Sequence, residues 1–193
     1  MWQQMFRGFK MMLVLTVLTG LAYPLVVTGL CQVFFRNQAD GSLVRANGRI
    51  VGSSLIGQNF KGPEYFQPRP SAAGNDGYDS TSSNAFNLGP TNQKLADRVK
   101  DSVAAFRKAN PDYTGPIPAD LLTSSASGLD PEISPASADV QAARIASARG
   151  ISRDQVRSLV VRNTQNRDLG FLGEPRVNVL AINLALDASF PKK

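Results

Sequence analysis

The longest apolar stretch of the chain lies near its N-terminus. Residues 11–35 carry no charged side chain, and Lys10 and Arg36 flank them. As an α-helix these 25 residues would be about 38 Å long, which is enough to cross a hydrocarbon core of about 30 Å with some tilt. A removable signal sequence would have a shorter apolar core of about 7–15 residues, followed by small residues. The pattern therefore predicts a single membrane anchor that the chain retains.

Small and weakly polar residues recur at every fourth position within this stretch. They are Thr16, Gly20, Pro24, Thr28 and Gln32, which form one slowly winding ridge on a helix. Such a ridge lets a second transmembrane helix approach closely and form hydrogen bonds. Pro24 also leaves the carbonyl of Gly20 without its usual donor. Thr and Gly are common in any membrane span, but we favour a helix-packing face, which implies a membrane partner.

The polar remainder of the chain begins with a hairpin pattern and a long loop. Residues 42–45 and 49–51 flank Asn47-Gly48, a strong signal for a tight turn, and so predict a β-hairpin. Residues 57–92 are rich in Gly, Pro, Ser and Asn but contain scattered aromatic side chains. This composition indicates a folded loop rather than a linker.

Three helices are predicted after this loop. The first covers residues 91–110, where apolar side chains recur at spacings of three and four. The second covers 134–150, with Ser134 as its N-cap and proline in its first turn. The third begins where Ser152 and Gln155 form a capping box.

The last apolar stretch, residues 176–184, completes the predicted fold. Its apolar density predicts a strand buried on both faces, with Asn178 and Asn183 in need of hydrogen-bond partners. The predicted class is α/β. An N-terminal head and transmembrane helix occupy residues 1–36, and one soluble α/β domain with about three helices and a small sheet occupies 37–193.

Composition removes whole classes of chemistry. The 193 residues include no histidine and a single cysteine, Cys31. Histidine-dependent triads, histidine-ligated zinc and internal disulfides are therefore excluded. The net charge is +6, but the basic residues form no run and no glycine-rich phosphate loop occurs. Ser189 and Lys192 match a Ser-x-x-Lys pair, yet they lie where we expect a frayed end. We expect no catalytic residues, no metal ligands and no nucleic-acid partner.

Two acidic pairs are the remaining candidates for a binding site. Asp76 and Asp79 could give oxygen ligands to a hard cation such as calcium. Asp in loops more often accepts hydrogen bonds from its own backbone, which is the interpretation we favour. Asp130 and Glu132 could form a carboxylate pair, but we interpret them as acidic residues at the entry to the helix at 134.

Arginines cluster along the second and third predicted helices. They are Arg144, Arg149, Arg153, Arg157 and Arg162. Guanidinium groups on one face could bind phosphate. No aromatic residues accompany them for base stacking, so we favour a solvated or partner-facing surface.

Several stretches, spread in order from the anchor to the C-terminus, carry a family resemblance. They are residues 52–58 (GSSLIGQ), 65–72 (YFQPRPSA), 87–92 (NLGPTN), 123–131 (TSSASGLDP), 148–150 (ARG) and 169–180 (LGFLGEPRVNVL). In these stretches and in its length, the chain resembles the C subunit of the bacterial potassium-transporting Kdp ATPase.

This resemblance implies an accessory, non-catalytic subunit of an ATP-driven, high-affinity potassium importer in the bacterial inner membrane. The implied partners are a P-type ATPase subunit, a channel-like subunit that selects potassium, and the lipid bilayer. The family is described as a catalytic chaperone that raises the ATP affinity of the ATPase subunit through a ternary complex, so ATP is the one cofactor implied. The family is also described with its soluble domain outside the cytoplasm, whereas ATP lies inside.

Charges beside the span give only a small preference for one orientation. Arg7 and Lys10 precede the span, and Arg36, Arg45 and Arg49 follow it, so the positive-inside rule is nearly balanced. A short head before a large tail favours the head inside and a periplasmic domain. The alternative to an accessory subunit is a free-standing, membrane-anchored periplasmic binding protein or enzyme, which would need a pocket with converging polar groups.

Overall fold

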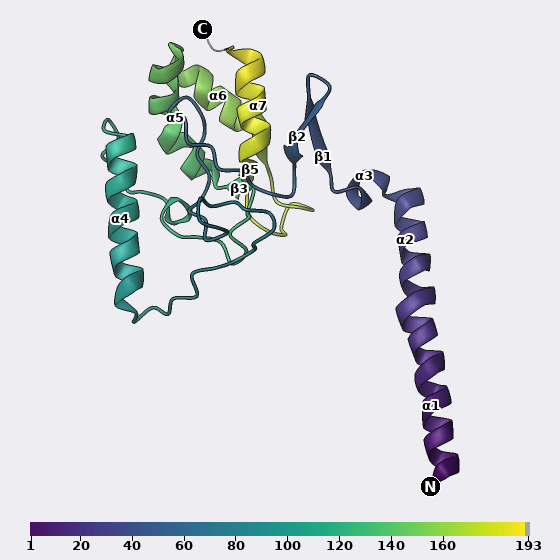
Figure 1. Ribbon diagram of the computed structural model, residues 1–193. Coiled ribbons are helices and arrows are strands. Elements are labelled where there is room, and N and C mark those ends of the chain that lie inside the picture. Colours follow the sequence, from purple (N-terminus) through teal and green to yellow (C-terminus); the bar gives the residue numbers. More distant parts are fainter. Residues whose placement is uncertain (192–193) are drawn as a thin grey trace. The chain divides into compact units, whose positions relative to one another are not determined.

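The computed structural model describes residues 1–191 of the chain (Figure 1). It divides into two compact units, one from Met1 to Leu43 and a second that begins at Val44. The first unit is helical, whereas the second combines helices with short strands. The predicted class, one N-terminal apolar helix and a mixed α/β domain, is confirmed.

One long helix makes up most of the first unit. It runs without a break through α1 (Trp2–Val17), η1 (Leu18–Ala22) and α2 (Tyr23–Phe34), and a single turn, α3 (Arg36–Ala39), follows it. Its mean hydropathy of 2.0 over an 18-residue window and its 33 residues make it long and apolar enough to cross a membrane. The helix is longer than the predicted span because the polar head before residue 11 continues the same helix.

A π-helical turn, η1, interrupts the α-helix directly before Pro24. The amide of Tyr23 donates to the carbonyl of Leu18, five residues earlier. Pro24 has no amide hydrogen, so the regular hydrogen-bond ladder is already broken at this point of the helix. A wider turn, which takes up one extra residue, is therefore least costly here.

The second unit begins with the predicted hairpin. Strands β1 (Leu43–Ala46) and β2 (Arg49–Ser53) pair with each other in a two-stranded sheet. Asn47 and Gly48 lie between them with φ values of 50° and 77°, which the tight turn requires. The Asn-Gly prediction is confirmed.

Three helices and a small antiparallel sheet enclose the core of this unit. The helices are α5 (Pro135–Arg149), α6 (Arg153–Asn163) and α7 (Val179–Ser189). The sheet has the order β3 (Glu132–Ile133), β5 (Arg176–Asn178) and β4 (Thr164–Gln165). Figure 1 shows the three helices gathered beside this sheet. The apolar side chains between these elements are buried, among them Ile133, Ile145, Val156, Leu159, Val177, Ile182 and Leu186.

Capping residues that stand in the sequence mark the ends of these helices in the structure. Asn92, Ser134 and Ser152 each accept a hydrogen bond in the first turn that they cap. Ser152 and Gln155 form the predicted capping box. Gly150 ends α5 with a left-handed φ of 66°, a conformation that glycine adopts without strain.

The predicted strand at 176–184 is wrong beyond its third residue. Strand β5 ends at Asn178, whose side-chain oxygen accepts a hydrogen bond from the amide of Ala181 and so caps α7. The buried positions 179, 182, 183 and 186 have helical spacing. Dense apolar sequence looked like a strand buried on both faces, but it is a helix buried on most of its surface. Both asparagines do have partners: Asn178 donates to the carbonyl of Ser54, and Asn183 binds the backbone of Phe66.

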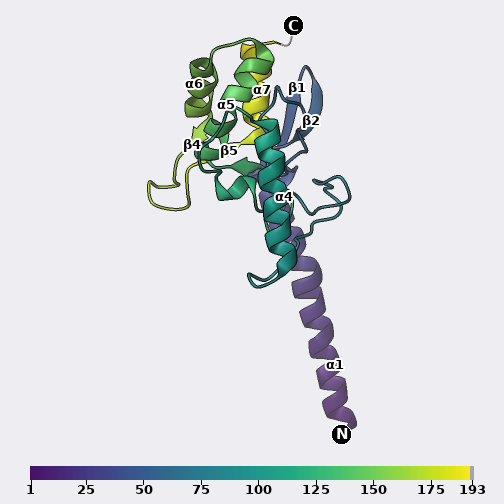
Figure 2. The ribbon, with the colours of Figure 1, turned by 90° about the vertical axis from the view of Figure 1, so that its left-hand side faces the viewer.

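Helix α4 (Gln93–Ala109) lies at the side of the second unit. Figure 2 shows it in front of the other helices of that unit. It has no fully buried side chain, so its apolar stripe is only half covered. A 3₁₀ turn, η2 (Ala119–Leu121), follows it and buries Leu121.

Candidate functional site

The long loop predicted at 57–92 folds against residues 125–130. The amide of Gly57 donates to the carbonyl of Leu129 at 2.9 Å, and the Ser71 hydroxyl donates to the carbonyl of Gly128 at 2.6 Å. Gly128 has a φ of 68°, and a Cβ there would lie 2.6 Å from the carbonyl oxygen of Asn84. Only glycine fits this close approach. The two segments are therefore positioned by backbone contacts that no helix or strand supplies.

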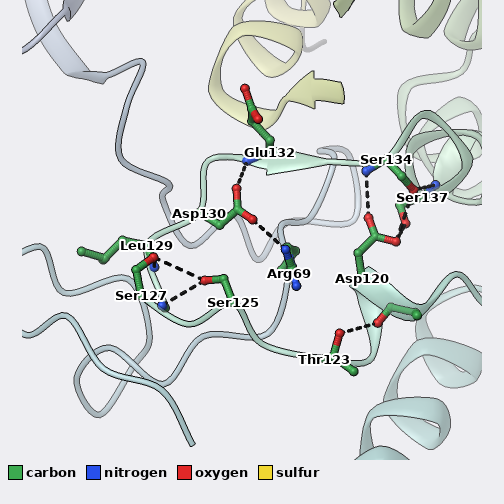
Figure 3. Close-up of polar contacts among 12 residues, drawn as sticks. Arg69, Asp120, Thr123, Ser125, Ser127, Leu129, Asp130, Glu132, Ser134 and Ser137 are labelled. Atoms are coloured by element: carbon green, nitrogen blue, oxygen red, sulfur yellow. Dashed lines mark hydrogen bonds and ion pairs between the residues drawn. The ribbon is translucent and has the colours of Figure 1, made fainter. Parts of the chain in front are cut away.

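Asp130 holds the centre of this region (Figure 3). Its carboxylate accepts from the Arg69 guanidinium at 2.7 Å and from the amide of Glu132 at 3.0 Å. Tyr78 lies beside this pair and donates its hydroxyl to the carbonyl of Arg69 at 2.9 Å. Burial, with Asp130 adding to it, raises the pKa of Tyr78 well above its ordinary value. Tyr78 is thus kept as a neutral hydrogen-bond donor.

The interpretation of Asp130 as a helix-entry carboxylate is wrong, because Asp120 has that role. Asp120 accepts from the amide of Ser134 at 2.8 Å and from the hydroxyl of Ser137 at 2.5 Å, at the first turn of α5 (Figure 3). No local pattern indicated this contact, since Asp120 lies 14 residues before the cap that it binds.

Glu132 belongs to a second ion-pair group. Its carboxylate binds Arg176 at 3.1 Å, and Arg176 also binds Asp168 at 3.4 Å. Burial raises the pKa of the Glu132 carboxyl, although Arg176 opposes this shift. In Figure 3, Asp130 points towards Arg69 and Glu132 points away from it. The two carboxylates therefore bind different arginines and do not form an acid–base pair.

The other acidic pair, Asp76 and Asp79, serves its own loop. The Asp79 carboxylate accepts from the amide and hydroxyl of Thr81 at 2.9 and 2.7 Å, and these bonds lower its pKa. Asn59 donates its side-chain amide to the carbonyl of Asp76. For Asp79 these contacts agree with the predicted binding to its own loop, whereas Asn59 contacts only the backbone of Asp76. Within residues 1–191, no three His, Cys, Asp or Glu side chains are placed to hold a metal ion.

The five arginines do not share one surface, so the predicted solvated face agrees with Arg153, Arg157 and Arg162 but is wrong for Arg144 and Arg149. Arg144 donates to the carbonyl of Tyr65 and to the side chain of Asn110, each at 3.0 Å, and burial lowers its pKa to about 10. The Arg149 side chain is 2% exposed and binds Asp187 at 2.7 Å. The helical spacing was correct, but α5 turns its last arginines inwards, where loop carbonyls need donors.

The remaining three arginines are exposed. Arg157 pairs with Asp139 across α5 and α6 at 2.7 Å. Arg153 and Arg162 lie on the surface of α6. Three side chains on this surface, one of them already paired, are a weak basis for a phosphate site. Of the predicted Ser-x-x-Lys pair, Lys192 lies outside the described residues.

An open groove of about 500 Å³ runs between α4 and the loop at 59–78. Phe60, Tyr78 and Phe106 contribute aromatic surface to it. Gln67 and Gln141 lie in its wall. The Gln141 side chain accepts from the backbone amide of Gln67 at 2.8 Å and donates to the carbonyl of Gln67 at 3.1 Å. The groove could hold a ligand by apolar contact and hydrogen bonds. Its ionisable lining residues are Lys61, Arg69, Asp76 and Tyr78.

Arg69 is the residue of this region that the sequence reasoning missed. It lines the groove, and its Nε atom is buried without a hydrogen-bond partner among the described residues. The pair of Arg69 and Asp130 joins two of the stretches that carry the family resemblance. A search of these stretches for oppositely charged residues could have predicted the pair of Arg69 and Asp130.

In the span, the five predicted packing residues lie on an exposed helix. Thr16 donates its hydroxyl to the carbonyl of Met12 at 2.8 Å, and Gln32 donates to Asp40 at 3.2 Å. A Cβ on Gly20 would meet only the methyl group of Thr16, at 3.9 Å. Pro24 and Thr28 are exposed as well. The helix surface around Gly20 is therefore open to a close neighbour.

The π-turn brings these five residues towards one side of the helix. In a regular α-helix, residues four apart drift by about 40°, so the five would wind through about 160°. One extra residue in η1 takes back about 100° of this drift. About 60° remains, which keeps the ridge from winding around to the opposite face.

These features define a single-span membrane protein with a small α/β domain, whose apolar core is accompanied by long polar loops. The family model described as "KdpC: K+-transporting ATPase, c chain" matches residues 5–188. This match covers both the span and the domain, so the chain belongs to the KdpC family.

Curated relatives agree with this assignment. The chain is 55% identical to the potassium-transporting ATPase KdpC subunit of Koribacter versatilis, over 99% of this chain and 97% of that protein. It is 58% identical to the KdpC subunit of Rhodospirillum rubrum, over 92% and 91% of the two chains. The KdpC subunit of Variovorax paradoxus is 57% identical over 91% of each. The family resemblance is confirmed, and the chain is a subunit of a potassium transport complex.

Proposed function

We propose that the chain is a non-catalytic accessory subunit of an ATP-driven potassium importer in the bacterial inner membrane. The observation that carries this proposal is the match to the c chain of K+-transporting ATPases from residue 5 to residue 188. A non-catalytic role is supported by the use of the candidate side chains. Asp130, Glu132 and Asp79 each bind an arginine or the backbone of the fold.

The span is proposed to bind membrane helices of the other subunits through the ridge from Thr16 to Gln32. Close packing and interhelical hydrogen bonds drive helix association in lipid, and small residues permit both. Gly20 has open space around it, and the π-turn holds the ridge near one side. The proposed partners are a P-type ATPase subunit and a channel-like subunit that selects potassium.

The soluble domain is proposed to lie in the periplasm. The short basic head before the span supports this orientation. ATP would then be on the opposite side of the membrane from the groove and the loops. We accordingly propose that the chain raises the ATP affinity of the ATPase subunit by stabilising one conformation of the complex, which is coupling between distant sites.

A free-standing periplasmic binding protein, the alternative considered from the sequence, has only the open groove of about 500 Å³ in its favour and is opposed by the family match. Purification of the tagged full-length chain in a mild detergent separates the two proposals. An accessory subunit co-purifies with a P-type ATPase. A binding protein elutes as a lone, monodisperse chain.

Two matched variants test the ridge in the same purification. Gly20→Leu places a large side chain where a neighbouring backbone should approach. Because an interhelical hydrogen bond contributes about 0.6–2 kcal/mol, we expect co-purification to fall by roughly tenfold. Leu18→Val lies outside the ridge and should leave it unchanged. Equal retention of partners by both variants would show that the spacing is accidental.

Orientation and the effect on ATP have separate tests. A reporter that works only in the cytoplasm, fused to the C-terminus, should be inactive. An active reporter on a tail protected from external protease would reverse the assignment. The complex without this chain should show a higher KM for ATP. A photoreactive ATP analogue that labels this chain would contradict the indirect mechanism.

A further inference from the structure

The loop between β4 and β5 presents apolar side chains to solvent. Leu169 is 83% exposed, Phe171 is 70% exposed and Leu172 is 49% exposed. We call these three residues the apolar tip. Figure 2 shows the loop that carries them projecting from the rest of the second unit. None of the three side chains contributes to the domain core, so fold stability does not explain their presence.

The apolar tip has a defined conformation. Asp168 and Leu172 exchange two backbone hydrogen bonds of 2.9 Å, which close the turn. Arg167 binds Glu174 at 2.7 Å across the base of the loop, and Arg176 binds Asp168 at 3.4 Å. The tip is thus a hydrogen-bonded turn held at its base by ion pairs.

Leu169 has an unfavourable backbone for its side chain. Its φ is 53°, in the left-handed region that leucine rarely adopts and that glycine or asparagine occupies more easily. The strain keeps an apolar side chain at the summit of the turn. A residue chosen only to make this turn would be Asn or Gly, so Leu169 indicates a contact outside the described fold.

The charges around the apolar tip favour a protein over a lipid surface. The four ionic groups at its base are two arginines and two carboxylates, and they are paired with one another or with Glu132. Membrane-binding segments combine apolar side chains such as Trp, Phe and Leu with an excess of cations, and this tip has no such excess. An apolar centre with a neutral polar rim is the composition of a protein–protein contact.

We propose that the apolar tip binds an apolar pocket on another subunit of the potassium transport complex, with Phe171 as the central anchor. The proposal rests on the proposed function as an accessory subunit. The tip lies within residues 5–188, the part of the chain that the family model matches. A large aromatic side chain inserted into a desolvated pocket is the typical energetic centre of such contacts.

Photo-crosslinking in native membranes tests which molecule covers the tip. A photoreactive phenylalanine analogue replaces Phe171 in the full-length chain of the assembled complex. Val161, which is 75% exposed on α6, is replaced in the control. The proposal expects a crosslink from position 171, and none from 161, to a partner subunit. Crosslinks to lipid alone, to a second copy of this chain alone, or to nothing in an intact complex would each overturn it.

Substitutions measure the contribution of the tip. Burial of the two side chains should strengthen association, so the variant Leu169→Asn with Phe171→Ser should weaken retention of the partner subunits by about ten- to hundredfold. Asn accepts a positive φ, so the domain's unfolding midpoint should not fall. Val161→Ser is the matched control with unchanged retention. Equal retention by both variants overturns the proposal, whereas a wild-type chain that retains no transport subunit shows that the proposed function itself has failed.

Discussion

The second unit has two halves that are held together by different forces. The helical half, residues 132–190, contributes every member of the main apolar core except Phe66. The loop half, residues 57–131, is held by hydrogen bonds and the pair of Arg69 and Asp130. Apolar burial tolerates small shifts, whereas hydrogen bonds need fixed geometry. In this domain a small apolar half anchors long polar loops that hydrogen bonds hold in place.

The largest expected effect is in the helical half. Ile182 is fully buried in α7, so Ile182→Ala should lower the free energy of unfolding by about 3 kcal/mol through lost burial and a cavity. Leu95→Ala, on the half-covered face of α4, should cost about 1 kcal/mol. Urea titration of the full-length chain, followed by circular dichroism, measures both. Equal costs would mean that α4 packs more firmly than its exposure indicates.

Two glycines with nearly the same φ test the geometry of the loop half. Gly128 and Gly150 have φ values of 68° and 66°, but a Cβ on Gly150 would meet no atom within 4 Å. Gly150→Ala should cost about 1 kcal/mol from backbone strain alone. Gly128→Ala adds a clash with a carbonyl oxygen and should cost about 2–3 kcal/mol. If thermal unfolding shows the same loss for both, the close approach in the loop half is not rigid.

A smaller effect is expected from the central ion pair of the loop half. Asp130→Asn removes the charge that Arg69 faces at 2.7 Å with both side chains about three-quarters covered. The free energy of unfolding should fall by about 1–2 kcal/mol. The exposed pair gives the control, because Asp139→Asn opposite Arg157 should cost about 0.5 kcal/mol or less.

The same Asp130 variant tests a catalytic role. Because Asp130 binds the fold, the ATPase turnover of the assembled complex should be largely intact in Asp130→Asn. Turnover is measured after assembly and folding have been shown to be normal. A collapse of turnover under those conditions would assign Asp130 a chemical function.

The smallest effect is a pH dependence at the border between the two halves. Burial raises the pKa of Glu132, with Arg176 opposing the shift and Asp130 and Asp168 adding to it. The folded state therefore binds this proton more tightly than the unfolded chain, and stability falls as pH rises from the ordinary pKa of glutamate through the raised one. Glu132→Gln should flatten this slope in urea titrations at several pH values. An unchanged slope would assign the titration to another group.

The sequence predicted elements well where the signal was local. The capping box at Ser152 and the Asn47-Gly48 turn depend on residues at most three apart, and both are confirmed. The continuation of 176–178 into a helix was missed because residues 179–186 are apolar at every position except Asn183, which masks the helical period. Arg69 and Asp120 were missed for a different reason: their partners lie 61 and 14 residues away, and only the folded loops bring them together.

Asn183 has a consequence for the order in which the chain folds. Its side chain donates to the carbonyl of Phe66 and accepts from the amide of the same residue, both at 2.9 Å, across 117 positions of sequence. One amide side chain thus bonds this backbone in the way that a neighbouring strand would. The contact closes nearly the whole domain into one loop, and such distant contacts form late in folding. During synthesis the loop half therefore cannot complete its structure until α7, which carries Asn183, has been made and has left the ribosome.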